Sequence, residues 1–225
     1  MKIAIIGTGI SGMVAAYLLH RDHEITVFEA AGYIGGHTNT IDVELDGRVY
    51  AVDTGFIVFN DWTYPNFIAL LTKLGVESQP SDMSFSVKCE RTGLEYNGTS
   101  INTLFAQRRN LFRPSFYRMI RDILRFNRES VELLDQPDPG PSLAVYLAVN
   151  RYSVEFIDHY IVPMGSAIWS ADHATMADFP ARYLVQFFKH HGMLSVNERP
   201  TWRVIKGGSQ RYMEKLIAPF HDRIR

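Results

Sequence analysis

Residues 2–12 read KIAIIGTGISG and residues 25–29 read ITVFE, and these two stretches decide the fold. The apolar run before Gly7 predicts a strand, the segment after Gly12 predicts a short helix, and residues 25–29 predict a second strand that ends in an acid. Strand, glycine turn, helix, strand and acid follow one another in the order of a βαβ unit that binds a dinucleotide. The sequence therefore predicts an α/β fold that begins with a Rossmann-like domain.

Each glycine of the turn has a steric reason to be there. Gly7 permits the tight turn out of the strand, Gly9 leaves the backbone open to a pyrophosphate, and Gly12 lets the helix pack close to the strand. The N–H groups of the first helical turn, at Ile10 and Ser11, bring the positive end of the helix dipole to the phosphates. All five residues are predicted to bind the cofactor.

Glu29 ends the second predicted strand, at about the distance from the turn that a ribose-binding acid requires. Its carboxylate can accept hydrogen bonds from the two ribose hydroxyls of an adenosine, and it would repel the 2′-phosphate of NADP. The alternative is a glycine-rich turn in an unrelated α/β protein. We favour the dinucleotide interpretation, because the strands, the helix and the acid all stand where that motif needs them.

The beginning of the chain also has some features of a secretory signal, since Lys2 precedes an apolar run that extends to Leu19. Glycine, serine and threonine break this run at the positions that a phosphate loop needs. No stretch approaches the roughly 18 unbroken apolar residues of a membrane span. We therefore expect no signal, no span and a cytoplasmic location.

A second glycine motif follows the acid, at Gly35-Gly36-His37-Thr38. Together with the first turn it resembles the flavin-binding N-terminus of the superfamily of flavin amine oxidases, phytoene desaturases and protoporphyrinogen oxidases. In that pattern, His37 stands at the usual arginine position, and Thr38 or Thr40 stands at the hydroxyl position. The resemblance implies that FAD is the cofactor, bound by Glu29 and by Gly35, Gly36, His37 and Thr38 in addition to the first turn.

Asp53-Thr54-Gly55-Phe56 follows a predicted hairpin over residues 40–52, which turns at Asp46-Gly47. In the resembling superfamily this segment leads into a loop beside the isoalloxazine ring. The resemblance therefore implies that Gly55 and Phe56 lie near the flavin and that Asp53 holds the loop. The alternative is an ordinary Asx turn followed by a core phenylalanine.

The composition is that of a soluble enzyme: 225 residues, 46% hydrophobic, with a formal net charge of −1. A charge near zero argues against a nucleic-acid-binding function. Cys89 is the single cysteine, so the sequence offers neither an internal disulfide nor a cysteine cluster for a metal, and we predict no metal site.

The pattern of elements predicts three segments. Residues 1–78 form the first part of the FAD-binding domain and end in a helix near Tyr64–Leu74, with Gly75 as its stop. Residues 79–200 form a mostly helical substrate-binding insertion, with short strands over 83–89 and 94–97 and a proline-rich linker at 135–141. Residues 201–225 return to the FAD-binding domain through a strand, a Gly207-Gly208 turn and a helix that ends near Pro219.

The insertion contains a predicted basic amphipathic helix over residues 116–134. Arg118, Arg121, Arg125 and Arg128 recur at spacings of three and four. We favour a solvated arginine face, since such stripes are common on ordinary helices. The alternative is peripheral contact between the Arg118–Arg128 helix and an anionic membrane.

Two aromatic residues of the insertion are candidates for a substrate cavity. Trp169 lies in a segment that resembles the approach to the flavin in the same superfamily, and Phe187 belongs to a second aromatic stretch. We expect both to line the wall of an apolar cavity. Helix–helix packing is the alternative for each of them.

The resemblance implies an FAD-dependent oxidoreductase that transfers a hydride from a small apolar or lipid-like substrate, an amine or an acyl chain, to flavin N5. The sequence assigns no catalytic acid or base, which suits chemistry supplied by a cofactor. Two alternatives stay open, an NAD-dependent dehydrogenase and an inactive dinucleotide-binding fragment. Because members of the superfamily are longer, we expect a truncated chain, with a compact relative as the alternative.

Overall fold

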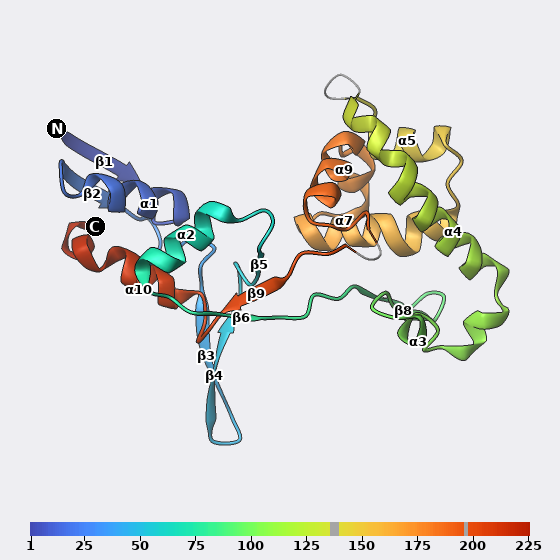
Figure 1. Cartoon of the computed structure of the whole chain (residues 1–225), viewed down its shortest axis with the longest axis horizontal. Helices are drawn as coiled ribbons and strands as arrows, with labels where there is room; N and C mark the ends of the chain where they lie inside the picture. The colour runs from blue at the N-terminus through green and yellow to red at the C-terminus, as the bar shows by residue number, and fades with distance from the viewer. Residues whose placement is uncertain (136–139, 196–197) are drawn as a thin grey trace. The chain divides into compact units, whose positions relative to one another are not determined.

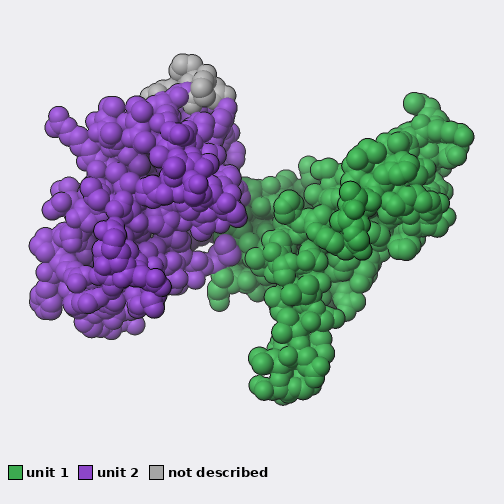
Figure 2. Space-filling view, turned by 180° about the vertical axis from the view of Figure 1, so that it is seen from behind, with its two compact units in different colours: residues 1–82, 201–225 green, residues 83–200 purple. Residues whose placement is uncertain are grey.

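The computed structural model describes residues 1–135, 140–195 and 198–225. The chain forms two compact units (Figure 2): unit 1 contains residues 1–82 and 201–225, and unit 2 contains residues 83–200. The boundary lies at 82/83 rather than at the predicted 78/79, because β6 (Ser78–Pro80) pairs with β9 (Trp202–Ile205) and so belongs to unit 1. Residues 136–139 of the predicted linker lie outside the described residues.

Unit 1 begins with the predicted βαβ unit. β1 (Lys2–Ile6) and β2 (Glu24–Phe28) pair in parallel, with Ile5 opposite Val27, and α1 (Ile10–Leu19) connects them (Figure 1). The alternating buried residues of the two strands pack with Met13 and Ala16 of α1 in one hydrophobic core. The strand, turn and helix predicted from residues 2–29 are therefore confirmed.

The predicted hairpin is formed by β3 (Thr40–Leu45) and β4 (Arg48–Asp53), with Leu45 opposite Arg48. Asp46 and Gly47 both have positive φ angles, 50° and 72°. Two central residues with positive φ are the signature of the tight turn that Asp-Gly favours. Most side chains of both strands are exposed, and Figure 1 shows the hairpin projecting from the rest of unit 1.

A second sheet of unit 1 joins segments that lie far apart in the sequence. Its strand order is β5 (Phe59–Asn60), β9, β6, with β9 antiparallel to both neighbours. α10 (Gln210–Ile217) packs against both α1 and α2 (Pro65–Leu74), and η4 (Ala218–Arg223), which follows it, packs against α1 and β2. Gly75 ends α2 in the left-handed conformation, with φ of 62°, as the sequence predicts.

The final two residues of the chain run beside β2. Ile224 forms a parallel bridge with Val27, the N–H of Arg225 donates to the Val27 carbonyl at 2.8 Å, and the N–H of Glu29 donates to the Arg225 carbonyl at 2.9 Å. β2 therefore has hydrogen-bonded neighbours on both of its edges, β1 on one and residues 224–225 on the other.

Unit 2 is mostly helical. Its hairpin is formed by β7 (Ser86–Cys89) and β8 (Leu94–Asn97). The helices are α3 (Ile101–Leu104), η1 (Arg108–Phe112), α4 (Pro114–Glu129), η2 (Ser130–Asp135), α5 (Leu143–Val149), α6 (Val154–Phe156), η3 (Ile157–Ile161), α7 (Val162–Trp169), α8 (His173–Asp178) and α9 (Ala181–His190). The larger of its two hydrophobic clusters is formed by residues from α4 to α9, and the smaller one joins the hairpin to the start of α4.

The basic helix α4 differs at both ends from the predicted range of 116–134. It begins at Pro114, whose fixed φ and missing N–H suit the first helical turn. It ends at Glu129, where the chain tightens into the 3₁₀ helix η2. The apolar spacing continues through this change of helix type, which explains the longer prediction.

Candidate functional site

The glycine loop between β1 and α1 has the backbone geometry that its sequence predicts. Gly7 has a φ of 92°, and a Cβ atom on Gly12 would lie 2.2 Å from the Gly7 carbonyl oxygen. A Cβ on Gly9 would meet no atom within 4 Å, so the space beside Gly9 is open. Gly9 also precedes α1 without a side-chain cap, which leaves the first-turn N–H groups at Ile10 and Ser11 available to an anion.

Thr8, between the first two glycines, ties this loop to Glu29. The carboxylate of Glu29 accepts hydrogen bonds from the Thr8 hydroxyl and from the Thr8 backbone N–H, the latter at 2.8 Å. The Thr8 hydroxyl in turn accepts from the backbone N–H of Gly35 at 3.1 Å. Thr8 is fully buried, so one hidden side chain joins the glycine loop, the acid and the second glycine motif.

These hydrogen bonds determine the charge state of Glu29. The Thr8 hydroxyl, followed by the backbone N–H of Ala31 at 2.9 Å and that of Thr8, lowers the pKa of Glu29 from 4.5 to about 2. Hydrogen bonds to the ionised form of a carboxyl favour that form. At neutral pH Glu29 is therefore a carboxylate, which is the acceptor that ribose hydroxyls require.

The second glycine motif packs against the first. A Cβ on Gly36 would lie 3.1 Å from the Cα of Gly9, and the carbonyl of Gly36 accepts from the Tyr33 hydroxyl at 3.1 Å. Gly35 has a φ of 133°, and a Cβ there would lie 2.4 Å from the Thr38 carbonyl oxygen. Backbone contacts that only glycine permits thus bring the two predicted motifs together.

The backbone of His37, within this motif, contacts the backbone of Gly55 and Phe56. A Cβ on Gly55 would lie 2.1 Å from the His37 carbonyl oxygen, and the N–H of Phe56 donates to that oxygen at 2.8 Å. The His37 residue is exposed. The Phe56 ring packs against Tyr64 and Phe67, with ring centroids 6.4 and 5.3 Å away, and it is partly buried against the core of unit 1.

The two candidate hydroxyl residues have partners within unit 1. Thr38 is buried, and its hydroxyl bonds the hydroxyl of Tyr212 on α10. Thr40 donates to Asp53 at 2.6 Å, and the same carboxylate oxygen of Asp53 accepts from the N–H and the hydroxyl of Ser209, each at 2.8 Å. Asp53 thus holds the end of the hairpin to the start of α10.

Three residues that sequence reasoning missed are therefore part of this framework: Thr8, Ser209 and Tyr212. A signal existed for Thr8, because it stands between two glycines of the predicted turn. Nothing in the spacing of Ser209 or Tyr212 points to partners 156 and 174 residues earlier in the chain.

The framework fits a dinucleotide cofactor. The backbone packs closely at Gly12 and Gly36, where a Cβ would meet Gly7 and Gly9, whereas the Cβ position at Gly9 is open. The first turn of α1 supplies N–H donors to this region, and Glu29 supplies an ionised acceptor at the end of β2. Phosphates, which need donors, and ribose, which needs an acceptor, both find matching groups.

The predicted cavity residues lie in unit 2. The Trp169 ring contacts Phe179 and Phe187, with centroids 4.8 and 4.9 Å away, and Phe187 stacks on His191 at 3.8 Å. The structure thus brings Trp169 and Phe187 together at the margin of the main core of unit 2. A substrate cavity at these residues stays a prediction.

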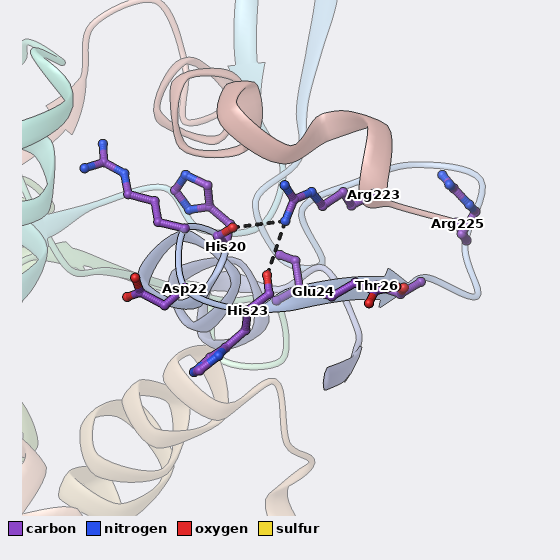
Figure 3. Close-up of a pocket in the computed structure, with 9 residues that line it drawn as sticks. His20, Asp22, His23, Glu24, Thr26, Arg223 and Arg225 are labelled. Carbon is purple, nitrogen blue, oxygen red and sulfur yellow. Dashed lines mark hydrogen bonds between the residues drawn. The ribbon is translucent and has the colours of Figure 1, made fainter. Parts of the chain in front are cut away.

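A polar hollow of about 540 Å³ lies at the opposite end of β2 from Glu29 (Figure 3). Arg223 points across it and donates to the carbonyls of His20 at 3.0 Å and His23 at 3.4 Å. These carbonyls follow the last turn of α1, where a basic side chain satisfies groups that the helix leaves open. The arginine therefore fastens η4 to α1, and the hollow is separate from the glycine loop.

Comparison with known proteins agrees with a fold that binds a dinucleotide cofactor. The family model for flavin containing amine oxidoreductase matches residues 10–224. Cyclohexylamine oxidase from Brevibacterium oxydans IH-35A is 21% identical, with a TM-score of 0.73 over 99% of this chain and 50% of that chain. A putative protoporphyrinogen oxidase from Exiguobacterium sp. 255-15 is 19% identical, with a TM-score of 0.62 over 100% and 52%.

A similarity in sequence concentrates in one part of the chain. Zeta-carotene desaturase from Solanum lycopersicum is 37% identical over 78 residues, which are 34% of this chain and 13% of the desaturase. The chain thus spans a small part of that relative and about half the length of the two solved structures. Within the described residues, no helix has the length and apolar character needed to cross a bilayer. A cytoplasmic location stays a prediction.

Proposed function

The chain belongs to the flavin-containing amine oxidoreductase family, and we propose from this premise that it supplies the FAD-binding site of an oxidoreductase acting on an apolar substrate. The family match confirms the expectation of a flavin cofactor and of redox chemistry. It argues against the alternative of an NAD-dependent dehydrogenase. The activity of the whole protein is a proposal, because the chain spans about half of the solved relatives.

Each part of the framework has a role toward the cofactor in this proposal. Gly9 and the first turn of α1 would hold the pyrophosphate, because the backbone there is open and offers N–H donors. Glu29 would accept hydrogen bonds from the ribose hydroxyls, and Thr8 keeps its carboxylate ionised and in place. When bound, the flavin would accept a hydride from a substrate C–H bond at N5.

The observation that carries the proposal is the contact between Gly36 and Gly9, since a Cβ on Gly36 would lie only 3.1 Å from the Cα of Gly9. A simple phosphate loop needs only the first glycine motif. A second glycine segment, laid against the first and held by the bond from Gly35 to Thr8, lets the backbone follow the cofactor further along its length.

An apolar substrate is supported by two observations. The aromatic cluster of Trp169, Phe179 and Phe187 gives unit 2 a group of large apolar side chains at its core margin. The sequence relatives include a zeta-carotene desaturase, which matches over 78 residues, and the structural relatives include an amine oxidase. An acyl chain and an apolar amine are therefore the two substrate classes to test.

The test of cofactor binding uses a variant that blocks the ligand without disturbing the fold. Gly9 has a φ of −64°, and its Cβ position is open, so Gly9→Ala should fold normally. Its methyl group would stand where the pyrophosphate must approach, and we expect FAD affinity to fall about tenfold or more. The matched control is Gly98→Ala in unit 2, where a Cβ would have only an ordinary contact at 3.8 Å.

The measurement is the visible absorption spectrum of the purified chain after FAD is added and the excess removed. Retained flavin bands in the parent and in Gly98→Ala, with weaker binding by Gly9→Ala, support the site. Equal affinity in all three proteins would place FAD elsewhere. A colourless parent would be tested again in a longer form of the protein, where continued failure to bind FAD would overturn the proposal.

The substrate class is tested by anaerobic bleaching of the bound flavin. Fatty acyl chains and apolar amines are offered separately to the flavin-loaded protein. Reduction by either class supports an oxidoreductase and distinguishes between the two. A flavin that binds but is bleached by neither would support the alternative of a fragment that is inactive by itself.

A further inference from the structure

An exposed patch on unit 2 combines large apolar side chains with arginines, where η1 meets α4. Its members line one hollow of about 590 Å³: Leu111, Phe112, Pro114, Tyr117, Arg118 and Arg121. We call these six residues the Phe112 patch. Leu124 and Arg128, also exposed, extend the same face along α4 at helical spacing.

Phe112 is the most exposed large side chain of the patch, at 87% of its full accessible surface. Leu111 and Tyr117 beside it are also exposed. The Tyr117 hydroxyl donates to the Leu111 carbonyl at 3.1 Å, so the helix holds the turn that presents Phe112. An apolar cluster that the fold presents to solvent in a fixed position marks an interaction surface.

The charge around this cluster is predominantly positive. Residues 101–128 contain seven arginines and one acid, Asp122, which is buried. The Arg121 side chain is 75% exposed and reaches Asp122 only at 4.0 Å. Arg118 pairs with Glu155 at 3.7 Å and stays half exposed. The exposed surface of this segment is therefore positive.

We propose that the Phe112 patch docks unit 2 onto an anionic phospholipid bilayer. Phe112 and Leu111 would enter the boundary between headgroups and acyl chains, while Arg118 and Arg121 would contact lipid phosphates. Tyr117 has an apolar ring and a polar tip, which suits the interface between them. This mode of binding uses both the exposed phenylalanine and the excess of positive charge around it.

The inference is independent of flavin binding, because every residue of the patch lies in unit 2 and the docking is measured without a substrate. It also changes the interpretation of the basic helix. Three arginines of α4 differ in their surroundings: Arg125 lies 3.5 Å from the buried Asp122 and stacks on the Tyr152 ring, whereas Arg118 and Arg121 line the patch. A solvated arginine stripe accounts for neither Phe112 nor Leu111.

The first test is flotation of the full chain with vesicles of phosphatidylcholine, with and without phosphatidylglycerol. We expect binding to the anionic vesicles at low salt, weaker binding at about 0.15 M salt, where the Debye length falls to about 8 Å, and little binding to neutral vesicles. Absence of binding to anionic vesicles at low salt would overturn the proposal and leave an acidic protein as the remaining kind of partner.

Paired variants assign the binding to the patch. Arg118→Gln/Arg121→Gln should weaken binding roughly fivefold per arginine, about 25-fold together. Phe112→Ser should weaken it several-fold. The matched controls, Arg151→Gln/Lys189→Gln and Val149→Ser, change exposed residues elsewhere on unit 2 and should leave it unchanged. Equal effects of patch and control variants would overturn the assignment.

Insertion is measured directly with Phe112→Trp. We expect a blue shift of the added tryptophan fluorescence and its quenching by lipid-attached quenchers when anionic vesicles are present. Val149→Trp, on a residue that is 74% exposed, should show neither. A Phe112→Trp spectrum that vesicles leave unchanged, in a protein that still binds them, would overturn docking through this side chain.

Discussion

The hydroxyl of Thr8 donates a hydrogen bond to the carboxylate of Glu29, 21 residues later in the chain. The same hydroxyl accepts from the N–H of Gly35, so a buried threonine holds Glu29 and both glycine motifs together. The acid is therefore positioned and ionised by the protein itself. A cofactor that binds there meets an acceptor already in place, which lowers the cost of ordering on binding.

Replacement of Thr8 by valine should remove the hydroxyl hydrogen bonds that link the first glycine motif to Glu29 and to Gly35 of the second motif. Valine keeps the shape but removes the hydroxyl, leaving the buried N–H of Gly35 without its partner, a loss of about 1–3 kcal/mol. The pKa of Glu29 should rise, because the Thr8 hydroxyl is the largest cause of its depression. Chemical denaturation and an NMR titration of Glu29 measure the two effects. Thr8→Ser retains the hydroxyl and should preserve both properties; a Thr8→Val protein with an unchanged Glu29 pKa would contradict this account.

Gly12→Ala should destabilise unit 1 although alanine favours helices. The gain in helix propensity is about 1 kcal/mol. The new Cβ would lie 2.2 Å from the Gly7 carbonyl oxygen, and forcing the backbone apart should outweigh that gain, for a net loss of about 2 kcal/mol. Urea denaturation measures the change. The comparison is Gly9→Ala, whose Cβ is unhindered and which should stay within about 0.5 kcal/mol of the parent. Equal stability of the two variants would show that α1 does not need its close approach to β1.

Acid should weaken the contribution of Glu29 to stability. Its pKa in the folded protein, about 2, lies below the ordinary 4.5, so its contribution is complete above pH 4.5 and is lost as the pH falls toward 2. The stability difference between the parent and Glu29→Gln should therefore shrink over this interval. Denaturation curves at a series of pH values measure it. Glu24→Gln at the other end of β2 is the control, since Glu24 has only an exposed partner, Lys2, at 3.8 Å. A difference that is constant from pH 6 to pH 3 would be inconsistent with the depressed pKa.

Asp122→Asn should destabilise unit 2 by about 2–3 kcal/mol, because it removes one partner of a buried ion pair. Asp122 is 1% exposed, lies 3.5 Å from Arg125 and accepts from the N–H of Ser153 at 2.9 Å. Thermal and urea denaturation measure the loss. Glu129→Gln breaks an exposed pair with Arg128 and should cost less than about 1 kcal/mol. The idea that Asp122 anchors α4 fails if the two variants are equally stable.

The elements that the sequence predicts correctly are those that depend on local backbone geometry. The turn at Gly7, the hairpin turn at Asp46-Gly47 and the end of α2 at Gly75 each need a positive φ. Glycine adopts a positive φ readily, so its presence indicates these turns. The end of a helix is predicted less well when only the spacing of apolar residues indicates it, as α4 shows. Its spacing continues past Glu129 although the helix type changes there.

The site is predictable in part for the same reason. The contact between Gly36 and Gly9 follows from two glycine motifs that each need a close backbone approach. The bonds of Tyr212 to Thr38 and of Ser209 to Asp53 depend on where the chain returns after unit 2, and no local pattern encodes that position. The exposure of Phe112 could not be predicted for another reason. An apolar residue is ordinarily expected in a core, and only the folded structure shows which apolar side chains stay exposed.

The pairing of β6 with β9 has a consequence for how this architecture can be altered. The N–H of Ser81 donates to the carbonyl of Trp202 at 2.9 Å, so the chain leaves and re-enters unit 1 through adjacent strands. All of unit 2 is therefore an insertion between two antiparallel strands that would otherwise form a β-hairpin. A short turn could replace it, and a different segment could be grafted between the same two strands, with the flavin framework left intact. The two ends of unit 2 thus stand on neighbouring strands of one sheet, so its length and sequence can change without altering the pairing of β6 with β9.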